Sequence, residues 1–200
     1  MIGLALLAGT VSAQEQQDAL KMWRNGDYAR AVEITQAEVD AAPNNLDAMV
    51  VMGWSLIALG RYGEAMEISD RAMEVSRFDY RVIENAGESH YYLGELEPAL
   101  QRFEQYAALA PRGDRIALVY SFMGEIYISL REYENADIAF STALHLNNNR
   151  SAWWTRLGYA RELAGKAVPA RDTYQHALEL DPSFGEAQRG LERMQQQLSD

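Results

Sequence analysis

Apolar side chains along the chain recur at i, i+3, i+4 and i+7, in pairs of stretches that repeat several times. This spacing places the apolar side chains on one face of an α-helix, so each repeat predicts two amphipathic helices. The last stripe is a clear example, and its members are Phe184, Ala187, Leu191, Met194 and Leu198. Glu, Gln and Arg occupy most other positions there. Residues 185–200 are therefore predicted to form a final helix with a polar outer face.

A short turn signal separates the two helices of each repeat. It is a Gly-x-Tyr string or a close variant, followed by Ala, and it starts at Gly26, Gly60, Gly94, Arg131 and Gly165. Gly in this place can adopt a positive φ and end the first helix in a left-handed cap. A second glycine lies seven residues earlier in the last four repeats, at Gly53, Gly87, Gly124 and Gly158. Without a Cβ, these residues allow two helices to approach closely.

The motifs resemble the tetratricopeptide repeat, whose pattern is W-x2-L-G-x2-Y, then A-x3-F, then P. One copy matches it with Trp154, Leu157, Gly158, Ala170, Tyr174, Ala177 and Pro182. The resemblance implies an all-α fold, an α-solenoid of about five stacked helix-turn-helix repeats with a C-terminal capping helix. We expect the repeats to occupy residues 14–184 and the solvating helix residues 185–200. The individual copies are expected at about 12–45, 46–79, 80–113, 117–150 and 151–184.

Composition excludes several classes of function. The formal net charge is −11 and no run of Lys and Arg is long enough to form a basic patch, so no nucleic-acid partner is expected. The chain has no cysteine, which excludes disulfides, thiolate catalysis and cysteine-bound metals.

The first thirteen residues, MIGLALLAGTVSA, are uncharged and mostly apolar. They are too short to span a bilayer, which needs about 20 apolar residues, but they match the apolar part of a signal peptide. Small residues at Val11 and Ala13 fit a cleavage before Gln14, although a positively charged leader is missing. We expect residues 1–13 to be a short or truncated signal peptide and the protein to be exported, periplasmic or secreted. The alternative is a helical turn that packs on the first repeat of a cytoplasmic protein.

No motif predicts catalysis, a cofactor or a metal. His90, His145 and His176 lie far apart, and the chain has no H-E-x-x-H and no G-x-S-x-G string. The string ELAGKA at 162–167 lacks the first glycine of a phosphate-binding loop and the Ser or Thr after the lysine. We therefore predict that the protein is not an enzyme and binds no cofactor.

The resemblance implies a concave groove lined by the first helix of each pair. The aromatic groove residues are Trp23, Trp54, Tyr91, Tyr92 and Tyr159. The charged groove residues are Glu84, Glu88, Glu125, Glu162, Arg189 and Arg193. Aromatic residues and Arg are favoured as binding anchors. The family's best-known peptide site uses Lys and Asn where this chain has Gln16 and Leu20, so that carboxylate clamp is not expected.

We predict from these residues a non-enzymatic protein-protein interaction scaffold, for example an assembly or tethering factor. Its groove is expected to bind an extended or helical segment with apolar anchors and some positive charge. In the alternative, the aromatic residues pack against neighbouring helix pairs. A second, separate alternative is a structural self-associating (homo-oligomeric) element whose groove is filled by its own N-terminal segment or by a second copy.

The adjacent Trp153 and Trp154 are the most conspicuous aromatic pair in the chain. Helical geometry directs Trp154 between the two helices of its own repeat and Trp153 toward the preceding repeat. Both are therefore predicted to pack in the core, and Tyr159 is the residue of this stretch expected to contact a ligand.

Overall fold

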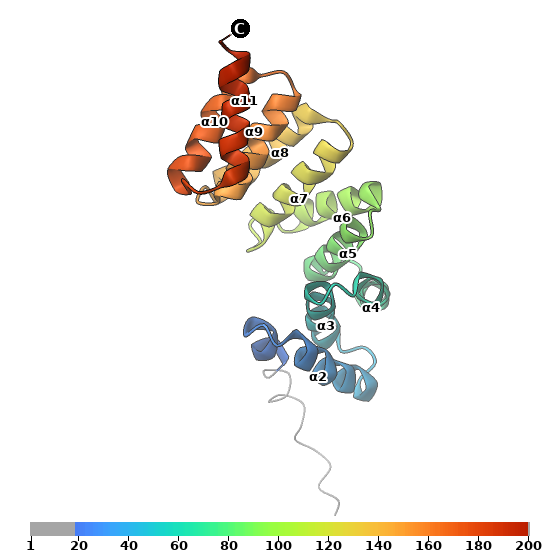
Figure 1. Cartoon of the computed structure of the whole chain (residues 1–200). Helices are drawn as coiled ribbons and strands as arrows, with labels where there is room; N and C mark the ends of the chain where they lie inside the picture. The colour runs from blue at the N-terminus through green and yellow to red at the C-terminus, as the bar shows by residue number, and fades with distance from the viewer. Residues whose placement is uncertain (1–18, 200) are drawn as a thin grey trace, which may run out of the picture. The chain divides into compact units, whose positions relative to one another are not determined.

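The computed structural model describes residues 19–199, and every regular element in this range is a helix (Figure 1). Residues 19–24 are helical. The following helices are α2 (Tyr28–Ala41), α3 (Leu46–Ala58), α4 (Tyr62–Val75), α5 (Tyr80–Tyr92), α6 (Leu96–Leu109), α7 (Ile116–Ser129), α8 (Tyr133–Leu146), α9 (Ser151–Leu163), α10 (Ala167–Leu180) and α11 (Gly185–Gln197). The predicted export signal in residues 1–13 lies outside the described residues, and so does Gln16, one of the two positions compared with the carboxylate clamp.

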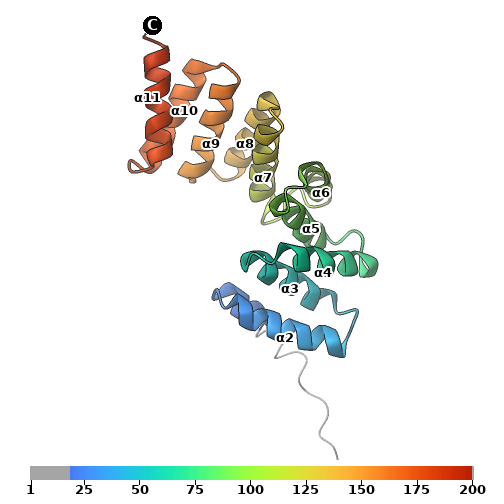
Figure 2. The ribbon, with the colours of Figure 1, turned by 45° about the vertical axis from the view of Figure 1, so that its right-hand side comes forward.

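The helices belong to two compact units, one up to Ala99 and one from Leu100 onward. In the first unit, α3 packs against α2, α4 and α5. In the second unit, α9 packs against α7, α8, α10 and α11, and Figure 2 shows α9, α10 and α11 side by side. This stacking of antiparallel helix pairs, ended by α11, confirms the predicted α-solenoid with a C-terminal capping helix.

Each turn within a helix pair closes with the same pattern of backbone hydrogen bonds. In the fourth turn, the N–H of Glu132 donates to the carbonyl of Tyr127 at 2.8 Å, and the N–H of Arg131 donates to the carbonyl of Ile128 at 3.0 Å. This is a Schellman motif, which requires a left-handed residue between the two helices. Arg131 has a φ of 63°, and the equivalent glycines have φ values of 74–82°. Arg131 thus adopts the left-handed conformation that glycine adopts in the equivalent turns.

The longer spacing before the fourth repeat changes both a loop and a helix. Residues 110–115 connect α6 to α7, whereas residues 147–150 connect α8 to α9. Helix α7 has 14 residues, one more than α9. The insertion therefore lengthens the loop by two residues and the helix by one.

Mid-helix glycines bring large side chains against a neighbouring backbone. A Cβ at Gly124 would lie 2.5 Å from Cε2 of Phe140, and one at Gly158 would lie 2.8 Å from the ring of Tyr174. Phe140 and Tyr174 are almost fully buried, so these two rings fill the space that the missing side chains leave. Burial of a side chain of this size stabilises the fold by about 1.5–3 kcal/mol.

The tryptophans of α9 are packed as their helical positions predict. Trp153 is 9% exposed and belongs to a core cluster with Phe140 and Leu144 of α8. Trp154 packs edge-on against His176 of α10, with ring centroids 4.2 Å apart. Its Nε1–H donates to the carbonyl of Asn148 at 2.8 Å. Both rings therefore stabilise the helix stack.

No helix among residues 19–199 combines the length and the apolar character that crossing a membrane requires.

Candidate functional site

A cavity of about 500 Å³ opens between the first helices of the N-terminal unit. We call it the tryptophan pocket, and it is lined by Ala19, Leu20, Trp23, Arg24, Thr35, Glu38, Asp47, Ala48, Val51, Trp54 and Arg81. The lining comes from the helical residues 19–24 and from α2, α3 and α5. Cavities of this size hold a large side chain or a small ligand.

The rings of Trp23 and Trp54 form the aromatic part of this pocket. Their centroids lie 5.2 Å apart at an interplanar angle of 35°. Both side chains are only half-buried, so each ring keeps apolar surface that a ligand can cover. The Nε1–H of Trp54 is buried and has no hydrogen-bond acceptor within residues 19–199. The structure thus brings together two predicted site residues that are 31 positions apart.

Two arginines with different surroundings stand at the rim of the pocket. Arg81 donates to both carboxylate oxygens of Asp79 and to Asp47, and its bonds to Asp79 raise the pKa of its guanidinium. Arg24 is exposed and makes no hydrogen bond or ion pair with the rest of the described chain. The pocket therefore combines two indole rings with an arginine, Arg24, that has no hydrogen-bond or ion-pair partner in the described part of the chain.

The two tyrosines at the end of α5 contact each other, and Tyr92 also contacts α4. Tyr92 stacks on Tyr62 with ring centroids 4.6 Å apart, and Tyr91 meets Tyr92 edge-on at 5.2 Å. Tyr92 is still 44% exposed. These contacts match the alternative in which groove aromatics stabilise neighbouring helix pairs, although one face of Tyr92 stays accessible.

The predicted acidic surface in the middle of the groove is not formed. Glu84 and Glu88 of α5 are 1% and 6% exposed, so the structure places them inside the helix stack. The sequence interpretation had placed them on an accessible face. Helical periodicity gives the direction of a side chain but not the depth of the neighbouring helices, and this is the reason for the difference.

The remaining acidic groove residues are neutralised by arginines of the next helix pair. Both carboxylate oxygens of Glu125 in α7 accept hydrogen bonds from Arg156 in α9, at 2.6 and 2.5 Å. Glu162 in α9 accepts two from Arg193 in α11, at 2.7 and 2.8 Å. Bidentate pairs of this kind satisfy both oxygens of the carboxylate. The arrangement therefore does not favour the positively charged partner that the sequence suggested.

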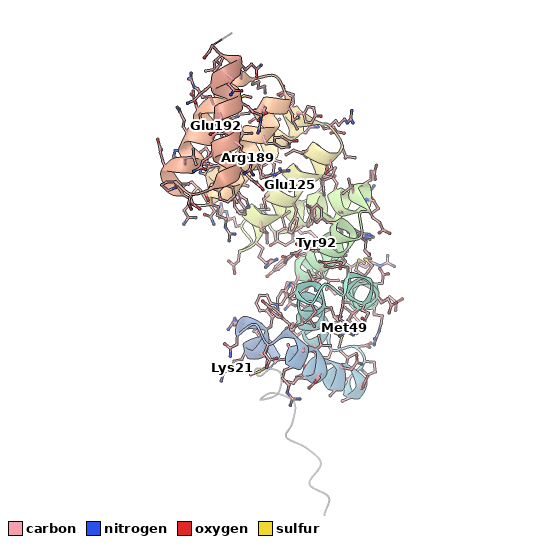
Figure 3. All side chains as sticks on the ribbon, viewed as in Figure 1. Lys21, Met49, Tyr92, Glu125, Arg189 and Glu192 are labelled. Carbon is pink, nitrogen blue, oxygen red and sulfur yellow. The ribbon has the colours of Figure 1, made fainter. Side chains whose placement is uncertain are left out.

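A second, smaller cavity of about 250 Å³ lies in the C-terminal unit. We call it the arginine pocket, and it is lined by Thr155, Arg156, Tyr159, Tyr174, Glu186, Arg189 and Arg193. The guanidinium of Arg156 lies over the ring of Tyr159, 5.1 Å from its centroid. Figure 3 labels Arg189 on α11 and Glu125 on α7. Predicted site residues Tyr159, Arg189 and Arg193 thus meet at one place.

Hydrogen bonds hold the walls of the arginine pocket. The hydroxyl of Tyr174 donates to Glu162 at 2.6 Å, and burial raises the pKa of Tyr174. Burial also opposes ionisation of Glu162, but the hydrogen bonds from Arg193 and Tyr174 outweigh it, so the pKa of Glu162 lies below its usual value. The ion pair is thus maintained at neutral pH, and the positions of Glu162 and Arg193 are fixed.

Two family models for the tetratricopeptide repeat match the chain, at residues 19–74 and 117–150. The chain is a tetratricopeptide repeat protein. Solved structures of such proteins have the same fold. PilF of Pseudomonas aeruginosa aligns over 94% of this chain and 84% of its own, with a TM-score of 0.80 and 18% identity. MamA of Desulfovibrio magneticus RS-1 aligns over 88% of this chain and 98% of its own, with a TM-score of 0.75 and 19% identity.

Curated relatives of this tetratricopeptide repeat protein are distant and longer. The peroxisomal targeting signal receptor of Saccharomyces cerevisiae is 21% identical over 94% of this chain. The match covers 33% of that receptor, and the curated relatives are covered over 15–33% of their lengths. These matches support a general role in protein interaction, and they name no partner for this chain.

Sequence reasoning missed Arg156 and Val51 as pocket residues of this tetratricopeptide repeat protein. Neither residue is among the groove residues predicted from the sequence. The long side chain of Arg156 reaches around its helix to Glu125, a contact that residue spacing does not reveal. Val51 is buried and lines the tryptophan pocket together with Trp54.

Proposed function

We propose that this chain is a non-enzymatic scaffold that binds a protein partner, and that the tryptophan pocket holds an apolar side chain of that partner. The observation that carries this proposal is the cavity of about 500 Å³ beside Trp23 and Trp54. Surface tryptophans around a concave pocket are typical of binding hot spots, because each ring buries a large apolar area at a small entropic cost.

The surroundings of the pocket favour a peptide segment over a small molecule. Its walls include the first helices of three successive repeats, which are the helical residues 19–24, α3 and α5. A segment lying across these helices can place one side chain in the pocket and continue on both sides. Arg24 at the rim can bind a backbone carbonyl or a carboxylate of that segment. The distant yeast relative is named as a receptor for a targeting signal, which also supports a peptide ligand.

The proposal is tested with peptides selected from a random displayed library against the full chain. A fluorescein-labelled copy of a selected peptide is titrated and its anisotropy measured. We expect an apolar anchor residue in the peptide, and dissociation constants about tenfold higher for Trp23→Ala and Trp54→Leu, since burial of such surface contributes about 1.5–3 kcal/mol.

The matched control is Phe78→Ala. Phe78 is a 73% exposed aromatic residue of the same unit and does not line the pocket. Its loss is expected to leave the affinity unchanged. Circular dichroism shows whether each variant folds. Equal affinities of the wild type and both folded tryptophan variants would refute the proposal.

A further inference from the structure

The arginine pocket gathers three guanidinium groups whose hydrogen-bonding capacity is only partly used. Arg156 and Arg193 each pair with a carboxylate through Nε and Nη2, and Nη1 of Arg156 has no hydrogen-bond partner among residues 19–199. Arg189 is exposed and has no hydrogen-bond or ion-pair partner among residues 19–199. Since guanidinium groups only donate, the group that completes this pocket must be an acceptor.

We propose that the arginine pocket binds a single carboxylate. Arg189 is its principal ligand, and Arg156 and Arg193 line the same pocket. The cavity of about 250 Å³ has room for a small polar group. Tyr159, held under Arg156, adds an apolar edge against which the carbon atoms next to the carboxylate can pack.

The charges around the pocket decide between a carboxylate and a phosphate. Arg156, Arg189 and Arg193 stand against Glu125, Glu162 and Glu186, so the neighbourhood has no net charge before a ligand binds. Glu186 itself lines the pocket and acts electrostatically on Arg156. A second negative charge on the ligand would meet this carboxylate and the net charge of −11 on the whole chain. A monoanion therefore fits better than a phosphate dianion.

The pocket is defined by residues of the C-terminal unit alone and does not depend on the tryptophan pocket. That a partner protein supplies the carboxylate rests on the proposed function. The existence of the site does not, because small molecules can test it directly.

Four small probes separate the sources of the acceptor in proton–nitrogen NMR titrations of the full chain. Acetyl-aspartate amide has a side-chain carboxylate, acetyl-asparagine has a terminal carboxylate, and acetyl-asparagine amide has neither. Inorganic phosphate at equal ionic strength is the fourth probe. We expect saturable shifts of the Arg189 Nε–H resonance with at least one carboxylate probe and none with the neutral amide, and the better carboxylate identifies the source.

Variants link the binding to the pocket. Arg189→Gln is expected to weaken carboxylate binding about tenfold, the loss for a charge-assisted hydrogen bond. Arg189→Lys keeps the charge but loses the planar guanidinium. Its affinity for the carboxylate is expected to lie between those of the wild type and Arg189→Gln. The control Arg171→Gln removes an equal charge from α10, where Arg171 pairs with Asp172 outside the pocket, and is expected to change nothing.

Three results would overturn the inference. These are the absence of a saturable shift with both carboxylates, equal binding of the neutral amide, or tighter binding of phosphate than of either carboxylate. A selected peptide that loses affinity in Arg189→Gln but not in the tryptophan variants would support this site and contradict the proposed anchor pocket. A peptide that loses affinity in the tryptophan variants but not in Arg189→Gln would support the tryptophan pocket as the peptide site and contradict a carboxylate contact of that peptide in the arginine pocket.

Discussion

The backbone N–H of Glu132 donates a 2.8 Å hydrogen bond to the carbonyl of Tyr127 across a turn in which Arg131 has a φ of 63°. The same turn contains glycine in the other four repeats. A residue with a Cβ pays about 1–2 kcal/mol for this left-handed conformation. Arg131 therefore stores a local strain that the surrounding packing offsets.

Replacing Arg131 with Gly is expected to raise the free energy of unfolding by about 1 kcal/mol, because the left-handed strain is removed. The gain is measured by urea denaturation followed by circular dichroism. Gly165→Ala is the reciprocal test, since Gly165 has a φ of 74° in the equivalent turn, and it should lose stability. A destabilised Arg131→Gly variant would contradict this expectation. It would show that contacts of the arginine side chain stabilise the fold by more than the left-handed backbone conformation destabilises it.

Adding one methyl group at Gly124 is expected to destabilise the C-terminal unit. The new Cβ would lie 2.5 Å from Phe140, a fully buried ring, and overpacking of this kind costs about 1–3 kcal/mol. Gly63 of α4 is the matched control because no atom lies within 4 Å of its built Cβ. Gly63→Ala should gain about 0.5 kcal/mol from helix propensity. Equal effects of the two substitutions in thermal melts would contradict the close approach of α7 and α8.

Truncation of Trp153 is expected to cost about 3–5 kcal/mol, the range for buried aromatic side chains. Trp153 is 9% exposed and packs against Phe140 and Leu144. Phe78→Ala is the control, because Phe78 is 73% exposed and its loss should change stability by no more than about 0.5 kcal/mol. If Trp153→Ala unfolds at the same urea concentration as the wild type, burial of the Trp153 ring does not stabilise the protein.

The ion pair of Glu162 predicts a dependence of stability on pH. The folded protein holds the pKa of Glu162 below its ordinary value of 4.5. Its contribution to stability is therefore present above pH 4.5 and is lost as the pH falls through the lower, folded pKa. The difference in unfolding free energy between the wild type and Glu162→Gln should be largest near neutral pH and shrink below pH 4.5. A difference that stays constant down to about pH 3 would show that the charge of Glu162 contributes nothing.

The fold was predictable because its signals are local. Helical periodicity, the left-handed turn position and the Cβ-free positions at Gly124 and Gly158 each act over a few residues or recur at a fixed spacing. Even the conformation of Arg131 followed from its register in the repeat. The direction of Trp153 and Trp154 followed from the helical angle between them.

The site was less predictable because it depends on contacts between repeats. The burial of Glu84 and Glu88 is decided by how closely the neighbouring helices approach, which no local pattern records. The pairing of Glu125 with Arg156 depends on the reach of a long side chain over 31 positions. Helical position predicts these aromatic residues as groove residues, but only the structure shows that Trp23 and Trp54 share a cavity whereas Tyr92 stacks on Tyr62.

The proposed partner places an apolar side chain in the tryptophan pocket, against Trp23 and Trp54. A double-mutant cycle between Trp54→Leu and replacement of the peptide's apolar anchor by Ala tests it most directly, with dissociation constants measured by fluorescence anisotropy. Direct contact predicts a coupling free energy of about 1 kcal/mol or more, because the second truncation costs little once the first is made. Strictly additive losses in a folded protein would place the anchor elsewhere and contradict the account.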